Sequence, residues 1–560
     1  SMSADRRAVQ EKQLLSRAGD KQQRLLLPRR THDTGNVSQS RSEKNLQAAI
    51  CLLLVELCER FTFFGIVCNM ILFCTVKLGY RNYQAAMVNM CFVGTSMLTP
   101  VLVGWLAECL VGRIKLVCVC LFLHFLGTVL LPVVAFPFED IYIDRRHILH
   151  TLTKKEQKIV FYFALLTASL GIGGIRAIVC PLSAYNLEDC GLKELLSFFN
   201  WFYWLVNLNS AVVFVSISYI QQSVARNLGF LIPFVSVLMA MITIHMVRGE
   251  MIYKPKTVVY YLTSLIKLRY NQHIYMNIDH STKMAKYLFV PLFSECYLIF
   301  FLTYIFQIPS GYYLQTMNSN LNFSGFVLPI AAMNVISIVP LLILVPILEC
   351  VNSCLFSSKG SRHSPTIYIV VGQLSAALSV MVAGFSEMHR KRFPQVEQTL
   401  SKEVLLVSSM PCFHLAPQYI LLGVAEALVT PSCSLLSFRL VPERIRGISL
   451  HFLTLFNGAG CFIGAFIVQT VHSGTRGNWF PHLLHEGKLE RFFFFLASLM
   501  MANTLGLWTI AHRYNDLNQE YTKEFRGSLP EEKPLQHEKA IKFYDSVLDR
   551  APILSPMETT

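Results

Sequence analysis

Long apolar runs alternate with short polar segments along most of this chain. Twelve runs approach the roughly 20 residues that a helix needs to cross the hydrocarbon of a bilayer. The first six lie near 47–70, 84–107, 115–136, 159–181, 199–220 and 228–247, and the second six near 287–307, 325–349, 365–385, 411–437, 448–471 and 491–511. The pattern predicts an all-α membrane protein with twelve transmembrane helices in two six-helix bundles.

The polar segments divide the chain into five parts. We expect a disordered basic tail over residues 1–45, a first bundle over 46–248, a linker over 249–286, a second bundle over 287–512 and a polar tail over 513–560. Within the linker, residues 257–269 are too few to span a bilayer and end in basic side chains, which favours a helix lying in the membrane interface.

Composition and charge agree with a polytopic membrane protein. The chain has 560 residues, of which 53% are hydrophobic and 15% charged, and this balance excludes an ordinary soluble core. Lys and Arg concentrate in the two tails and the linker, so the positive-inside rule places both termini in the cytoplasm. The formal charge of +14 follows from this topology, and no nucleic-acid partner is needed to explain it. The sequence is compatible with a location in either the plasma membrane or an endolysosomal membrane.

Three further features limit the chemistry. The 16 cysteines lie mostly in apolar runs without metal-ligand spacing, so we expect no metal site. The spans contain no nucleophile motif or paired aspartates, so we expect no enzyme. Asn322 begins the one glycosylation sequon on a predicted outer loop.

The most informative stretch begins at Glu56, where two carboxylates and a guanidinium lie inside the first apolar run. Ionised groups at membrane depth are costly unless they pair or face water. Glu56 and Arg60 have the spacing of neighbours on one helix face, with Glu59 beside them. The fourth run carries a second cation, Arg176, which we expect to pair with Glu56 or Glu59. Such groups often mark a transport pathway, and a purely structural ion pair is the alternative.

Other polar side chains fall within the predicted spans. Tyr203 and Asn207 share one face of the fifth helix. Glu426, on the tenth, is an isolated carboxylate that is either held protonated or ready to meet a cation such as a substrate amine.

Four stretches together resemble the proton-coupled oligopeptide transporters, solute carrier family 15. They are Glu56-x-x-Glu59-Arg60-Phe61, Gly171-x-Gly173-Gly174-Ile-Arg176, Phe202-Tyr203-x-x-Val206-Asn207, and Gln418-Tyr419 continuing to Glu426. The resemblance covers residues 46–512 and implies the major facilitator superfamily fold. The turn that contains Glu108 and Arg113 is similar to a loop of that superfamily in which an acid and an arginine latch neighbouring helices.

The resemblance also implies roles. Glu56, Glu59, Arg60 and Arg176 would couple transport to protons, the only coupling ion, with no other cofactor. Arg176 would also meet the carboxylate of a zwitterionic substrate, and Glu426 its amine. The remaining residues expected to line the site are Tyr203, Asn207, Gln307, Asn334 and Ser337. The implied function is symport of protons with small amino-acid-like or di/tripeptide-like substrates by alternating access.

Several positions differ from the family's pattern. Val67 stands where peptide carriers have an arginine, Phe63 and Phe64 replace a tyrosine pair, Met90 replaces a histidine, and Phe306 replaces an acid. Together with polar tails that could recruit protein partners, these changes motivate an alternative function. The protein would then be a transporter-shaped sensor or adaptor that binds a small ligand without moving it.

Overall fold

The structure is a computed structural model that describes residues 34–68, 70–106, 113–135, 153–187, 192–224, 226–247, 309–356, 365–400, 403–440 and 446–527. By its internal contacts the chain divides into Ser1–Gln47 and Ala48–Thr560. The packing described below belongs to the second unit.

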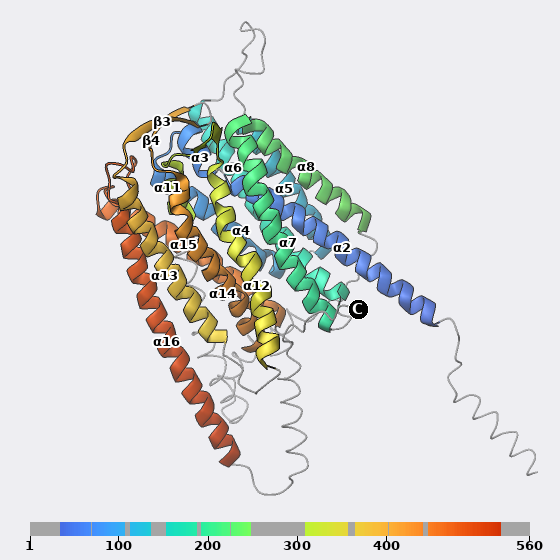
Figure 1. The fold of residues 1–560 in the computed structure, drawn as a ribbon. Helices are drawn as coiled ribbons and strands as arrows, with labels where there is room; N and C mark the ends of the chain where they lie inside the picture. Colours follow the sequence, from blue (N-terminus) through green and yellow to red (C-terminus); the bar gives the residue numbers. More distant parts are fainter. Residues whose placement is uncertain are drawn as a thin grey trace, which may run out of the picture. The chain divides into compact units, whose positions relative to one another are not determined.

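Helices make up most of the described residues (Figure 1). Those of the first half are α2 (Thr34–Val67), α3 (Met70–Leu72), α4 (Asn82–Leu106), α5 (Arg113–Ala135), α6 (Lys154–Leu187), α7 (Leu192–Tyr219) and α8 (Arg226–Val247). Those of the second half are α11 (Pro309–Met317), α12 (Asn334–Phe356), α13 (Pro365–Arg390), α14 (Ala416–Leu440), α15 (Arg446–Gly474) and α16 (Leu489–Gly527). In the described part, eight apolar stretches of 18 to 24 residues are long enough to cross a membrane.

The helices match eleven of the twelve predicted spans. The seventh span, near 287–307, and the linker over 249–286 lie outside the described residues. Two helices extend into segments that we assigned to the tails. Residues 34–45, which we assigned to a disordered tail, form the first turns of α2, and α16 continues past residue 512 to Gly527. A helix that an apolar span has nucleated can add polar residues at little cost, because each new residue contributes its own backbone hydrogen bond.

Two small antiparallel sheets were not predicted. The first pairs β1 (Asn322–Phe323) with β2 (Phe326–Val327), so the eighth span begins as a hairpin and a 3₁₀ turn, η5 (Ile330–Met333), before α12. Ser324 and Gly325 have φ angles of 52° and 86°, which close this hairpin and exclude helix there. The second sheet pairs β3 (Gln395–Leu400) with β4 (Glu403–Ser408), between α13 and α14.

Glycines determine how closely α5 and α6 pack. A Cβ atom at Gly171 would lie 2.4 Å from the backbone nitrogen of His124, and one at Gly174 would lie 2.1 Å from Cys120 Sγ. Only glycine therefore lets the two backbones approach at these positions. The Gly-rich stretch singled out in the sequence thus has a packing role, and it places Arg176 next to α2.

Contacts between the two halves gather at the end of the bundle where β3, β4 and α3 lie, here called the hairpin end (Figure 1). Asn82 Nδ2, at the start of α4, donates to the carbonyl oxygens of Pro481 and His482. The ring of Tyr83 stacks on that of His472 with centroids 3.7 Å apart. Gln222 Nε2 donates to the carbonyl of Leu328 at 3.1 Å, and Gln222 Oε1 accepts from the backbone nitrogen of η5.

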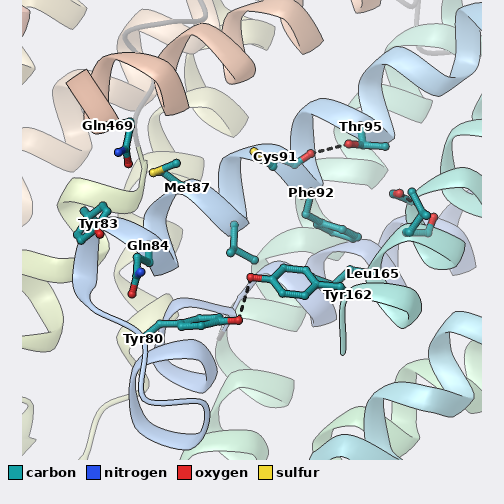
Figure 2. Close-up of a pocket in the computed structure, with 13 residues that line it drawn as sticks. Tyr80, Tyr83, Gln84, Met87, Cys91, Phe92, Thr95, Tyr162, Leu165 and Gln469 are labelled. Atoms are coloured by element: carbon teal, nitrogen blue, oxygen red, sulfur yellow. Dashed lines mark hydrogen bonds between the residues drawn. The ribbon is translucent and has the colours of Figure 1, made fainter. Parts of the chain in front are cut away.

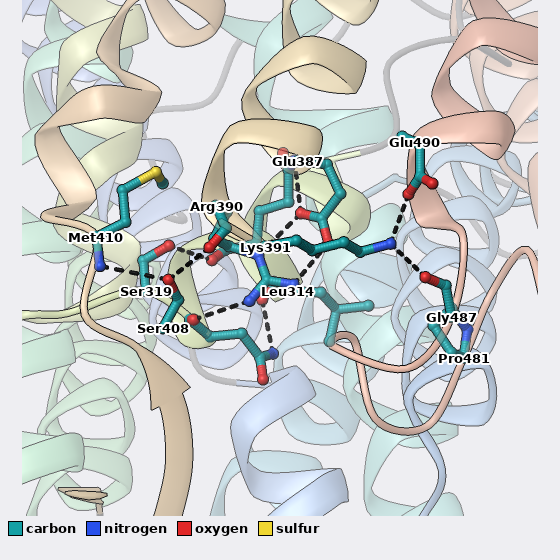
Figure 3. Close-up of polar contacts among 12 residues, drawn as sticks. Leu314, Ser319, Glu387, Arg390, Lys391, Ser408, Met410, Pro481, Gly487 and Glu490 are labelled. Atoms are coloured by element: carbon teal, nitrogen blue, oxygen red, sulfur yellow. Dashed lines mark hydrogen bonds and ion pairs between the residues drawn. The ribbon is translucent and has the colours of Figure 1, made fainter. Parts of the chain in front are cut away.

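A buried ionic network anchors β3 and β4 to the second half (Figure 3). Arg390 Nη2 lies 2.6 Å from Glu387 Oε1, and both side chains are almost fully buried. The carbonyl of Arg390 accepts from Ser408 Oγ at the end of β4, at 2.7 Å. Next to it, Lys391 pairs with Glu490 of α16 at 2.7 Å. The network connects α13, the second hairpin and α16, so its charges stabilise the fold at this end.

Candidate functional site

The charged cluster on α2 has the geometry that its spacing predicts. Arg60 Nη2 lies 3.2 Å from Glu56 Oε1, one helical turn away, and Arg60 Nε lies 3.6 Å from Glu59 Oε2. Glu56 and Glu59 are both buried, whereas the Arg60 side chain is 24% exposed. The helix therefore holds two buried carboxylates against a single cation of its own.

Arg176 on α6 supplies the second cation, and its partner is Glu59. Arg176 Nε donates to Glu59 Oε1 and Oε2 at 3.1 and 3.2 Å, and Nη2 lies 3.1 Å from Oε1. This confirms that Arg176 finds a carboxylate, and it selects Glu59 over Glu56. Because both groups are buried, either would be costly without the other.

Phe63 completes the environment of Arg176. The guanidinium carbon lies 4.3 Å from the centre of the Phe63 ring, a distance at which the ring face attracts a cation. Phe63 also stacks on Phe92 of α4 at 6.0 Å. In the sequence, Phe63 stood out only for lacking a hydroxyl, and its contact with Arg176 was missed because it depends on how α2 meets α6.

Two other positions that differ from the family's pattern, Met90 and Val67, have apolar surroundings, whereas Phe306 lies outside the described residues. Met90 is buried in the same hydrophobic core as Phe63, and Val67 packs against that core half-buried. In this structure, neither position presents a polar group to the cluster.

One carboxylate oxygen of the cluster has no hydrogen-bond donor among the described residues. Glu56 Oε2 is buried and accepts no hydrogen bond from any described residue. Buried polar atoms are nearly always partnered in folded proteins. An oxygen in this position has the capacity to carry a proton, which would convert it from an acceptor into a donor.

The predicted residues of α7 are only partly described. Asn207 is half-buried, and its carbonyl accepts from Ser210 Oγ at 2.7 Å. The side chain of Tyr203 lies outside the described residues. Asn209, which was not predicted, donates from Nδ2 to the carbonyl of Leu57 at 3.0 Å and so holds α7 against α2 beside the cluster.

In the second half, Ser337 and Glu426 lie on helices that pack closely. A Cβ atom at Gly423 would lie 2.0 Å from the carbonyl oxygen of Ser337, so α14 contacts α12 there, and Glu426 follows one turn later on the same face. Ser337 Oγ donates to the carbonyl of Asn334, the first residue of α12. Glu426 is half-buried and makes no ion pair or side-chain hydrogen bond with any described residue, as expected for an isolated carboxylate.

Besides Tyr203, three predicted residues have side chains that the structure does not describe. Gln307 and Glu108 lie outside the described residues, and Arg113 begins α5 but its side chain is not described. The sequon residue Asn322 is exposed on β1, where its side-chain oxygen accepts from Gly325 N at 3.1 Å, and its glycosylation stays a prediction. In the part of the chain that the structure describes, no three His, Cys, Asp or Glu side chains gather as metal ligands.

Two cavities occur beside the helices. One, of about 420 Å³, lies between α4, α6 and Gln469 of α15 (Figure 2). At its edge the hydroxyls of Tyr80 and Tyr162 are 2.9 Å apart. The other, of about 450 Å³, is lined by α2, Asn209 of α7, and α8. None of the residues predicted to bind substrate lines either cavity.

Comparisons with known proteins agree with this arrangement. The model of the POT family (PTR2) matches residues 114–258 and 250–480. The chain is 54% identical over 549 residues to solute carrier family 15 member 5 from Homo sapiens, covering 94% of this chain and 95% of that protein. It is 24% identical to protein NRT1/PTR family 5.4 from Arabidopsis thaliana, covering 83% of this chain and 94% of that protein.

Solved structures share the fold. An auto-inhibited POT family peptide transporter superposes with a TM-score of 0.65 at 16% identity, covering 84% of this chain and 97% of that one. A POT family transporter in complex with 5-aminolevulinic acid gives a TM-score of 0.62 at 14% identity, covering 83% and 96%. The helical arrangement, the matched family model and the relative with 54% identity lead to one conclusion: this chain belongs to the POT family of membrane transporters.

Proposed function

We propose that this protein is a secondary transporter that couples protons to the movement of small zwitterionic solutes, amino-acid-like or di/tripeptide-like, by alternating access. The observation that carries the proposal is the buried pair of Glu59 and Arg176, which links α2 to α6 in the first half. A buried ion pair of this kind can act as a switch if protonation of its carboxylate breaks it.

The proposed coupling step begins at Glu59. A proton on its carboxylate removes the negative charge that holds Arg176, and the guanidinium then needs another anion. The carboxylate of a zwitterionic substrate would supply it, while Glu426, which has no described partner, would hold the substrate's amine. Loss of the proton on the other side of the membrane would restore the Glu59–Arg176 pair and expel the substrate.

The contacts at the hairpin end support an alternating-access cycle. If both termini are cytoplasmic, the hairpin end faces outward, and the arrangement seen here is closed to the outside. Its closing contacts include Tyr83 with His472 and Gln222 with the backbone of η5. They are individual hydrogen bonds and ring contacts, each of which the transport cycle can break at a modest cost in free energy. The related transporter solved with 5-aminolevulinic acid, a molecule with an amine and a carboxylate, supports a zwitterionic substrate.

Uptake into proteoliposomes with an inward acid gradient tests the proposal. We expect a panel of di- and tripeptides and histidine to include at least one solute whose uptake rises with the gradient. Glu59→Gln should abolish the dependence on the gradient, and Glu426→Gln should raise the KM for that solute. Glu397→Gln, an exposed change on β3, is the matched control and should alter neither.

If Arg176→Ala and Glu426→Gln leave the uptake of every solute unchanged, the assignment of the site is wrong. If no solute is taken up but one raises the thermal stability of the purified protein, the alternative function as a sensor or adaptor is favoured.

A further inference from the structure

His124, in the middle of α5, is a buried titratable group whose ring has no hydrogen-bond partner among the described residues. Its exposed fraction is 0%, and neither Nδ1 nor Nε2 makes a hydrogen bond with any described residue. Thr128 donates to the backbone carbonyl of His124 and does not contact the ring nitrogens. An apolar side chain would pack here without unpaired nitrogens, so packing alone does not account for a histidine.

The position of His124 connects it to the charged cluster. Gly171 of α6 contacts the backbone of His124, and Gly174 contacts Cys120 one turn earlier on α5. Arg176 follows Gly174 by two residues, and its charge acts on the His124 ring. The histidine therefore lies on the helix that packs against α6 next to Arg176.

The charges around this histidine are few. From α6 the facing group is Arg176, which is paired with Glu59 of α2, and Glu56 lies one turn earlier on that helix; both carboxylates are buried. On its own helix the neighbour is Cys120. On α8, the one titratable side chain among those described is His245, which is exposed in the last turn. With the imidazole neutral, two carboxylates balance Arg60 and Arg176, and a further positive charge would be unfavourable.

We propose that His124 is a second proton-binding site of the cluster, occupied when the positive charge of Arg176 is neutralised by an anion or moved away from α5. The proton adds to a free ring nitrogen and comes from water that enters the site, and the imidazolium replaces the charge that Arg176 has withdrawn. The proposal deepens the proposed function, because a substrate carboxylate on Arg176 would then favour binding of a proton at His124.

Thermal unfolding of the purified full-length protein between about pH 5 and 8 tests this without transport. We compare wild type, His124→Gln, Arg176→Gln and the double variant. Removing Arg176 leaves the cluster one charge short, so His124 should bind a proton and stabilise the folded state as pH falls. The midpoint of Arg176→Gln, measured relative to the double variant, should therefore rise at low pH by about 2 °C or more. With Arg176 present the folded ring stays neutral while the unfolded one binds a proton, so the wild type should instead lose stability relative to His124→Gln as pH falls.

The proposal is overturned if the midpoint of Arg176→Gln does not rise relative to the double variant at low pH. A buried histidine that stays neutral makes the midpoint fall, and one that binds a proton equally in the folded and unfolded states leaves the two profiles parallel. Arg60→Gln is the matched control: it removes the same charge from the cluster but leaves Arg176 beside the ring, so adding His124→Gln to it should change the profile as it does in the wild type.

A direct measurement covers the case in which Arg176→Gln fails to fold. Nitrogen NMR of ¹⁵N-histidine-labelled wild type, with His124→Gln to assign the signal, should show a neutral His124 ring across the same pH range. A wild-type ring that titrates in this range contradicts the proposal. Since neither experiment measures flux, failure of the transport assay would refute the proposed function and leave the proton site standing, and the reverse also holds.

Discussion

At the scale of single residues, the cluster of α2 and α6 pairs each of its buried carboxylates with an arginine. Glu59 and Arg176 share three contacts of 3.1 to 3.2 Å, and the ring of Phe63 covers the guanidinium. Glu56 is held by Arg60 on one oxygen only. The cluster is thus nearly balanced, and addition or removal of one proton changes which pairs are favourable.

The close packing of α14 against α12 requires glycine at position 423, and this requirement can be tested. Gly423→Ala should destabilise the protein by about 1–3 kcal/mol, because the added methyl group would overlap the Ser337 carbonyl and push α14 away from α12. Gly506→Ala on α16 is the control: nothing lies within 4 Å of its Cβ position, so it should be neutral or slightly stabilising. Thermal unfolding of the two variants measures the difference. Equal stabilities would show that the two helices do not pack this closely.

At the scale of elements, the small β3–β4 sheet is stable because a buried ion pair ties it to the helices. Arg390 lies at the end of α13, where Glu387 neutralises its charge and Asn318 and Ser408 bind it through backbone and hydroxyl hydrogen bonds. Gln315 Nε2 donates to the other Glu387 oxygen at 3.1 Å. A two-stranded sheet has too little buried surface to be stable alone, and this network supplies the missing contacts.

Glu387→Ala should cost about 3–5 kcal/mol, because it leaves the Arg390 guanidinium buried without its carboxylate. Replacing both residues by methionine should recover part of this loss, since no charge is then buried. Glu397→Ala, exposed on β3 of the same hairpin, should have little effect. Thermal unfolding and the yield of folded protein measure all three, and a double variant no better than Glu387→Ala would contradict this explanation.

At the scale of the whole molecule, the two halves meet through α4 with α15 and α7 with α12. Gly94 and Gly458 allow close approach along the first of these pairs. The polar and aromatic contacts at the hairpin end then close one side of the interface. A few weak, specific contacts can hold a closed state and still allow it to open, which an extensive hydrophobic seal would not.

Replacing Gln222 by alanine tests whether the contacts at the hairpin end hold the closed state. The change removes two hydrogen bonds between the halves, each contributing about 1 kcal/mol, so the ratio of closed to open molecules should fall by roughly 30-fold. Spin labels at the exposed positions Arg81 and Asn478 should report a longer distance between the halves by pulsed electron resonance. Glu397→Ala, which lies within one half, should leave the distribution unchanged. A distribution that Gln222→Ala does not alter would show that these bonds do not hold the closed state.

The division between sequence and structure has a physical basis. The spans, the pairing of Glu56 with Arg60 and the membership of the family could be predicted, because each depends on residues close together in the chain or on a local motif. The hairpins were missed because strands of two to six residues are too short to show a clear alternation of apolar and polar side chains between long apolar runs. The extensions of α2 and α16 were missed because polar helix turns resemble polar tails in sequence.

By itself, therefore, the sequence determined that this is a polytopic membrane protein with buried charges that must be paired. Only the tertiary structure decided how they are paired. Glu59 and Arg176 are 117 residues apart, and whether Arg176 meets Glu59 or Glu56 depends on how α6 packs, which its glycines allow by close contact with α5 and α4. The same packing places Phe63 against the guanidinium and buries His124 on α5, and no local pattern encodes these long-range contacts.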